Sequence, residues 1–299
     1  MAEAKEVYVE YNEGESKKQN KFVKFFKYVF TYNNKPKKRI WELDILRGIL
    51  MIFVTLCHCC QFGNQLGIFD FVTPFGIKVH NFINTYSGSA FAEGIQPFGL
   101  WLFCWLSGVN CSFSRSKLRR VLKMAFFCGL FMGGYYALHL LVPSFIVGDL
   151  IFNIIAVITI CVTIWWLLDL VKCPDWIRVG IAIVAICLGL TYYYMDYVRG
   201  GAWVENDFLA LMVYNGHAHD ISRQDFQPLF PHLGWFILGG VMGKKIYKEK
   251  KTLTKHEEPY KAFRPLAYIG KHSLVVYMIG TVVVLGLVWA IKDIVHLFL

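Results

Sequence analysis

The chain has 299 residues, of which 56% are hydrophobic and 17% aromatic, and its mean hydropathy is +0.44. Only 17% are charged, whereas soluble domains carry about 25%. This composition excludes an ordinary soluble domain and predicts an all-α polytopic membrane protein. The net charge of +10 does not indicate nucleic-acid binding, because the basic residues gather in particular connections, where anionic lipid and membrane topology account for them.

Three regions follow along the chain. Residues 1–19 are polar, and we expect them to be disordered. Residues 20–38 place phenylalanines at helical spacing against lysines, which predicts a basic amphipathic segment in the membrane interface. Residues 39–299 hold recurring apolar stretches and form the predicted transmembrane domain. The N-terminus lacks the apolar core of a secretory signal, so we expect the first span to be retained.

About seven transmembrane helices are predicted, each long enough to cross about 30 Å of hydrocarbon. Their approximate ranges are 41–62, 91–112, 120–142, 149–170, 177–196, 227–243 and 270–291.

Lysine and arginine in the connections give the expected orientation. Residues 1–40 hold ten of them, residues 113–123 five and residues 244–264 eight, whereas the alternate connections hold almost none. The positive-inside rule therefore predicts a cytoplasmic N-terminus and a C-terminus outside.

Arg47 and His58 are the most informative polar residues, because they lie eleven positions apart in the first apolar stretch. At about 100° per residue they share one helix face, about 16 Å apart along the axis. Ionisable groups within a membrane are costly unless they meet partners or water, which favours a functional role. Asp44, three residues before Arg47, is placed to hold the guanidinium. An ion pair that only fixes helix packing is the alternative.

Further polar residues are expected at the depth of His58. They are His139 near the outer end of the third span, Asp149 and Asn153 at the start of the fourth, and Asp225 before the sixth. Four helices would then contribute to one outer cavity. We expect no metal, because Cys57-His58-Cys59-Cys60 points in several directions on a helix and the loop histidines His217 and His219 are a weak signal. The cysteines are interpreted as small apolar residues.

Several stretches carry a family resemblance. Arg39-Ile-Trp-Glu-Leu-Asp-Ile-Leu-Arg-Gly-Ile, Phe103-Cys-Trp-Leu-Ser107-Gly108-Val-Asn-Cys-Ser112, Asp225-Phe-Gln-Pro-Leu-Phe-Pro-His232 and Gly270-Lys271-His272-Ser273-Leu-Val-Val-Tyr277 follow one another along the chain. In this order they resemble bacterial membrane proteins related to the heparan-alpha-glucosaminide N-acetyltransferase catalytic domain, within the transmembrane acyltransferase superfamily. The sequence departs from that pattern at Asn153, Gly280 and His232, which bear on the acceptor.

The resemblance implies an acyl-CoA-dependent enzyme of the bacterial cytoplasmic membrane that moves an acetyl group to a sugar amine or hydroxyl at the outer face. His58 would match the catalytic histidine and Arg47 the group that meets acetyl-CoA. The expected partners are acyl-CoA, a sugar acceptor, a bilayer with anionic lipid at its cytoplasmic face, and a second copy of the chain in a homodimer.

The chemistry of the residues gives roles to the others. A histidine with a pKa near neutrality suits a general base, although a covalent acyl-histidine route is equally open. Guanidinium and ammonium groups bind phosphates, so we expect Arg47, held by Asp44, together with Lys271 and His272 to hold the donor, and Ser107 to let its arm pass. Asp225 and Asn153 are expected at the catalytic centre, and His139, Asp149 and His232 at the acceptor.

Two other functions stay open. In a transporter or carrier the face from Arg47 to His58 would line a polar path, and in a non-catalytic assembly partner His58 would be dispensable.

Overall fold

Helices provide all the regular secondary structure of the residues that the computed structural model describes, and no strand occurs among them. The described residues are 25, 28–30, 39–65, 74–87, 89–114, 116–141, 152–197, 199, 201, 203–221, 226–247, 251–254 and 258–298. The all-α prediction is confirmed for this part of the chain.

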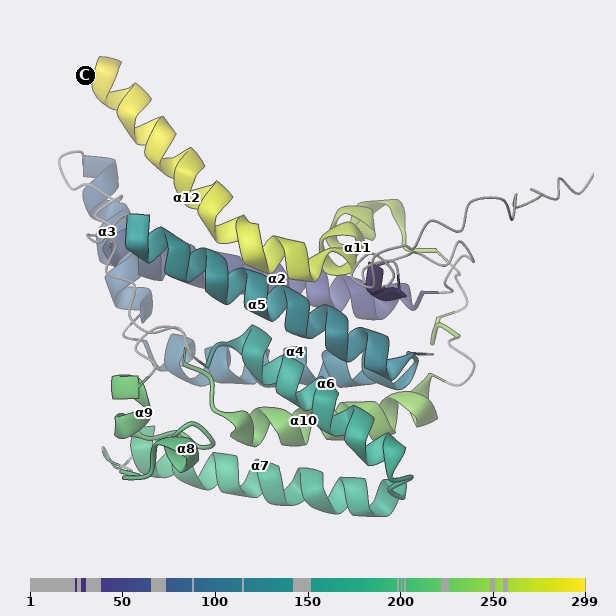
Figure 1. Cartoon of the computed structure of the whole chain (residues 1–299). Helices are drawn as coiled ribbons and strands as arrows, with labels where there is room; N and C mark the ends of the chain where they lie inside the picture. The colour runs from purple at the N-terminus through teal and green to yellow at the C-terminus, as the bar shows by residue number, and fades with distance from the viewer. Residues whose placement is uncertain are drawn as a thin grey trace, which may run out of the picture. The chain divides into compact units, whose positions relative to one another are not determined.

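Each of the seven predicted apolar segments coincides with a helix (Figure 1). These helices are α2 (Trp41–Gln65), α4 (Ala90–Ser112), α5 (Lys117–Leu141), α6 (Ile154–Leu170), α7 (Asp175–Tyr197), α10 (Leu229–Ile246) and α12 (Ser273–Phe298). Two stretches of the described helices, Trp41–Cys60 and Asp175–Asp196, are long and apolar enough to cross a membrane. The count of seven spans and the orientation of the termini stay predictions.

Five shorter helices were not predicted. They are α3 (Pro74–Ser87), α8 (Asp207–Ala210), α9 (Gly216–Ile221), the 3₁₀ helix η2 (Lys261–Phe263) and α11 (Arg264–Lys271). All of them lie in connections between the apolar helices, where hydropathy alone gives no helix signal.

Residues 1–36 form a unit of their own, separate from residues 37–299. The predicted polar segment 1–19 lies outside the described residues. Of the predicted amphipathic segment 20–38, only Phe25 and residues 28–30 are described, and all four are helical.

Helix α10 packs against α4, α6 and α7 in the larger unit. Glycines allow the closest of these approaches: a side chain at Gly108 of α4 would overlap the backbone of Phe236, and one at Gly239 would overlap that of Trp105. Small residues let helix backbones meet in this way when the surroundings are apolar. Gly108 therefore belongs to the α4–α10 contact.

Helix α11 packs against the first turns of α2, and the first part of α12 lies beside α2 before the helix diverges from it (Figure 1). Gly48 of α2 faces the backbone of Leu266, while Gly270 of α11 faces the backbone of Asp44. This mutual close approach fixes α11 beside the part of α2 that carries Asp44 and Arg47.

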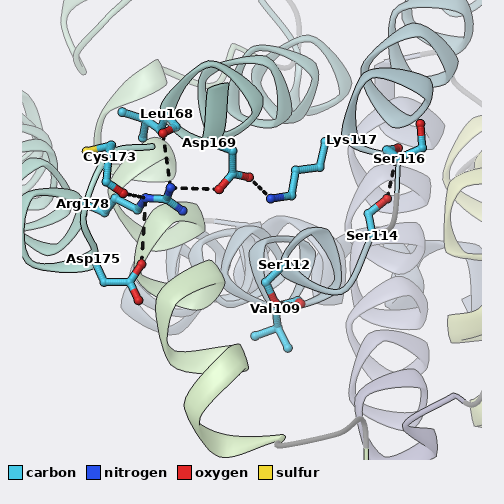
Figure 2. A network of polar contacts seen from close by, with 10 residues as sticks. All are labelled: Val109, Ser112, Ser114, Ser116, Lys117, Leu168, Asp169, Cys173, Asp175 and Arg178. Atoms are coloured by element: carbon cyan, nitrogen blue, oxygen red, sulfur yellow. Dashed lines mark hydrogen bonds and ion pairs between the residues drawn. The ribbon is translucent and has the colours of Figure 1, made fainter. Parts of the chain in front are cut away.

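A partly buried polar network joins α5, α6 and α7 at one end of these helices (Figure 2). Asp169 of α6 pairs with Lys117 of α5 and, at 2.9 Å, with Arg178 of α7. Arg178 also donates to the carbonyls of Cys173 and Leu168 at 3.0 and 3.3 Å, and its guanidinium lies over the Trp165 ring at 4.7 Å. A guanidinium this deeply buried needs such compensation, so the network ties the three helices together.

Candidate functional site

One face of α2 carries both of the polar residues singled out by the sequence. Arg47, Leu50, Val54 and His58 follow one another at intervals of three and four residues within an unbroken helix. Such residues lie on the same helix face. The predicted alignment of Arg47 and His58 on one α2 face is therefore borne out by the geometry.

Arg47 is buried, with 5% of its surface exposed. Its Nη1 donates to Asp44 Oδ1 at 2.9 Å, and Arg39 Nε donates to the other oxygen of the same carboxylate, also at 2.9 Å. The Nε and Nη2 groups of Arg47 are buried and have no hydrogen-bond partner within the described part of the chain. One carboxylate therefore serves two guanidinium groups, and Arg47 keeps donors that an anionic ligand would satisfy.

The other predicted donor-binding residues lie at or near this end of α2. Lys271 and His272 end helix α11, directly after Gly270, whose Cα faces the Asp44 backbone. Lys271 is exposed, and the His272 ring lies 4.7 Å from the Tyr268 ring. Ser107 is different, because it is buried in α4, next in sequence to Gly108 of the α4–α10 contact.

His58 lies in a pocket at the other end of the same α2 face. The apolar lining comes from Leu50, Phe53, Val54, Gly99, Leu100 and Ile154. The polar lining comes from Cys57, His58, Gln96, Gln227 and Tyr277. We call this the His58 pocket. It joins residues of α2, α4, α6 and α12 with the segment before α10.

The His58 ring is oriented by an aromatic neighbour. Tyr277 of α12 meets it edge to face, with ring centroids 5.7 Å apart and an interplanar angle of 67°. This T-shaped geometry is a favourable one for aromatic rings. Beside it, the Cys57 thiol lies 3.6 Å from the hydroxyl of Tyr86 on α3. Burial, followed by the contact with Cys57, raises the pKa of Tyr86 to about 12.

The side chains of Asn153 and His232 both form hydrogen bonds with backbone groups. The Asn153 side-chain oxygen accepts the N–H groups of Ile155 and Ala156 at 2.9 and 3.0 Å, so it caps the N-terminus of α6. Its neighbour Ile154 lines the His58 pocket. His232 is fully buried in α10 and donates from Nδ1 to the Pro228 carbonyl at 2.7 Å. Neither side chain is among the described pocket residues.

The side chains of three predicted site residues lie outside the described part of the structure. Asp149 and Asp225 lie outside the described residues, and His139 is placed on α5 without a description of its side chain. In the connection between α7 and α10, His217 Nε2 donates to Asp207 Oδ1 at 2.8 Å. Among the described residues no group of three metal-ligating side chains comes together, and all nine cysteines are free.

The sequence-based interpretation missed Gln96, Gln227 and Tyr277 as pocket residues. Gln227 and Tyr277 fall within motifs quoted above, and Gln96 directly precedes Pro97 of α4. Their roles depend on which helices meet, which hydropathy and spacing do not reveal.

Comparison with known proteins gives one match. The family model described as heparan-alpha-glucosaminide N-acetyltransferase, catalytic, matches residues 39–282. No curated protein and no solved structure matches the chain.

Proposed function

The chain belongs to the heparan-alpha-glucosaminide N-acetyltransferase catalytic domain family, and from this premise we propose that it transfers an acetyl group from cytoplasmic acetyl-CoA to a sugar acceptor at the outer face of the membrane. Family membership and two apolar helices indicate a membrane-bound acetyltransferase. The finer assignment rests on one observation: the α2 face that carries Arg47 continues through Leu50 and Val54 into the His58 pocket.

Arg47 is proposed to bind the phosphates of the donor. Its unpaired Nε and Nη2 groups offer two further hydrogen bonds of the kind that phosphate oxygens accept. Lys271 and His272 directly follow Gly270, which packs against the backbone of Asp44. Their side chains are therefore proposed to add positive charge and hydrogen-bond donors at the end of α2 that carries Arg47. The offset of about 16 Å between Arg47 and His58 is the length that the donor's arm would cross along α2.

His58 is proposed to act as the general base. The acceptor oxygen or nitrogen attacks the thioester carbon, the carbon–sulfur bond breaks, and His58 takes the acceptor proton and returns it to the CoA sulfur. Tyr277 would hold the imidazole in position through its edge-to-face contact. In the covalent variant His58 carries the acetyl group between two such steps. Asp225 and Asn153 are proposed to serve the catalytic centre, and His139, Asp149 and His232 the acceptor.

The test uses the full chain in nanodiscs with radiolabelled acetyl-CoA, glucosamine-type acceptors and a thiol reagent that detects released CoA. His58→Ala should lower turnover by about 10²–10⁴-fold while acetyl-CoA binding persists. His80→Ala is the matched control, because that imidazole lies on α3 and contacts Asn84 at 2.9 Å.

Arg47→Lys tests the donor site. It should weaken acetyl-CoA binding with less effect on turnover at saturation, because an ammonium cannot reproduce the planar donor fork. Arg39→Ala is its control, since Arg39 shares Asp44 but is exposed. If the intact protein neither binds acetyl-CoA nor releases CoA, the enzyme assignment fails; flux of an anion into vesicles that depends on His58 would then favour a transporter.

A further inference from the structure

Basic side chains from three helices meet around one tryptophan of α6. Lys117 at the start of α5 and Arg178 of α7 both pair with Asp169 (Figure 2). The Arg178 guanidinium lies 4.7 Å from the centre of the Trp165 ring, and the Lys244 ammonium of α10 lies 5.3 Å from it. We call these five residues the Trp165 cluster. The positive-inside rule places basic residues on one side of a membrane, but it does not require them to converge on one point.

A glycine of α10 makes room for this convergence. A Cβ at Gly240 would lie 2.6 Å from the Trp165 ring, so the ring packs directly against the α10 backbone. Trp165 is fully buried there. Its ring attracts cations through its negative face, and it thereby brings the charged ends of α7 and α10 together.

The Trp165 cluster holds more positive than negative charge. Asp169 serves both Lys117 and Arg178, and the half-exposed Asp175 lies 4.0 Å from Arg178 Nε. Within the described part of the chain, no ion pair reaches the exposed Lys244. Arg178 is 3% exposed, and its Nη1 group is buried without a hydrogen-bond partner among the described residues. A buried donor of this kind and a free ammonium both favour an added anion.

The surroundings of the cluster indicate which kind of anion fits. Leu170 and Val171 directly follow Asp169, and Trp176 directly follows Asp175. These three apolar side chains are 65%, 71% and 75% exposed. An exposed tryptophan is typical of a membrane interface. A soluble anion would gain nothing from apolar neighbours, whereas a phospholipid presents a phosphate and acyl chains together.

We propose that the Trp165 cluster binds the phosphate of an anionic phospholipid headgroup at the predicted cytoplasmic side of the membrane. Lys244 contacts the phosphate, and the acyl chains lie along Leu170, Val171 and Trp176. Basic pockets between transmembrane helices recognise lipid headgroups by the same chemistry. The site requires a membrane but no catalytic step, so it stands or falls separately from acetyl transfer.

The experiment measures which lipid the full chain retains in detergent. Dioleoyl phosphatidylglycerol and dioleoyl phosphatidylcholine carry the same acyl chains and differ in net charge, and native mass spectrometry counts the molecules bound. We expect the wild type to keep phosphatidylglycerol at concentrations at which phosphatidylcholine is lost. Phosphatidylglycerol should also raise the unfolding temperature of the wild type, because a ligand that binds only the folded state stabilises it.

The exposed Lys244 is the residue to change, because its replacement leaves the buried ion pairs intact. Lys244→Gln should lower the affinity for phosphatidylglycerol about fivefold, and Lys244→Glu should lower it further. Lys245→Gln is the matched control, since it removes the same charge from the next residue, which is also exposed. It should lower the affinity clearly less.

Two kinds of result overturn the proposal. Equal retention of the two lipids, or an equal loss in Lys244→Gln and Lys245→Gln, would mean that no specific site exists. Displacement of phosphatidylglycerol by inorganic phosphate or by acetyl-CoA would mean that the cluster takes a soluble phosphate instead of a lipid.

Discussion

Replacing Gly270 by alanine tests whether the contact between α11 and α2 sets the donor site. An added Cβ would lie 2.7 Å from the carbonyl carbon of Asp44 and 2.8 Å from the nitrogen of Gly48. These neighbours are backbone atoms, which cannot rotate away. Overpacking of this kind costs about 1–3 kcal/mol, whereas the higher helix propensity of alanine returns at most about 1 kcal/mol.

The expected result is a net loss of up to about 2 kcal/mol in the free energy of unfolding, together with weaker acetyl-CoA binding. Binding should weaken because the added Cβ overlaps the backbone of Asp44, whose carboxylate holds Arg47. A shift of about 1.4 kcal/mol in that positioning corresponds to about tenfold in affinity. Thermal unfolding of the purified chain and calorimetric titration with acetyl-CoA measure the two effects.

Matched glycines supply the controls. A Cβ at Gly129 of α5 meets nothing within 4 Å, and one at Gly280 of α12 meets its nearest atoms at 3.5 Å. Alanine at either position should leave stability equal or slightly raised. The reasoning is refuted if Gly270→Ala unfolds at the same temperature as Gly129→Ala and binds acetyl-CoA as the wild type does.

Three further substitutions test the fold and the site. Asp169→Asn should lower the free energy of unfolding by about 3–5 kcal/mol, because it removes the carboxylate that lies 2.9 Å from the buried Arg178 guanidinium of α7. Asp175 is half-exposed and lies 4.0 Å from the same guanidinium, so Asp175→Asn should stay within about 0.5 kcal/mol of the wild type. Chemical denaturation measures both values. Asn153→Ala should cost about 1 kcal/mol through loss of the α6 cap, more than Asn206→Ala in the exposed four-residue α8; lost turnover at unchanged melting temperature would instead make Asn153 catalytic. Tyr277→Ala should lower kcat about threefold to tenfold at unchanged KM by releasing the imidazole it orients, and Tyr277→Phe should restore it; equal kcat in both variants would remove the positioning role.

The long helices were predictable because their signal is local. Apolar runs and the spacing from Arg47 to His58 depend only on helix geometry, so both are found where the sequence predicts them. The short helix α11 was missed because its apolar face is only eight residues long. In the structure Gly270 of α11 packs against α2, and the sequence of α11 does not indicate which helix it packs against.

Some predicted site residues have other surroundings because burial and capping depend on tertiary contacts. Asn153 was expected at the catalytic centre, and its oxygen is used by two backbone N–H groups of α6. His232 was expected to meet the acceptor and is fully buried beside Pro228. The catalytic roles of Asp225 and the acceptor roles of His139 and Asp149 stay predictions.

The sequence by itself determined that the chain is helical and apolar, that it resembles a membrane acetyltransferase family, and that Arg47 and His58 share one helix face. These properties follow from composition and from the α-helical period of 3.6 residues, and both can be read from a single segment of the sequence. Only the tertiary structure decided that Gln96, Gln227 and Tyr277 line one pocket with His58 and that α11 packs against Asp44. Such groupings join residues far apart along the chain, and packing between helices is what brings them together.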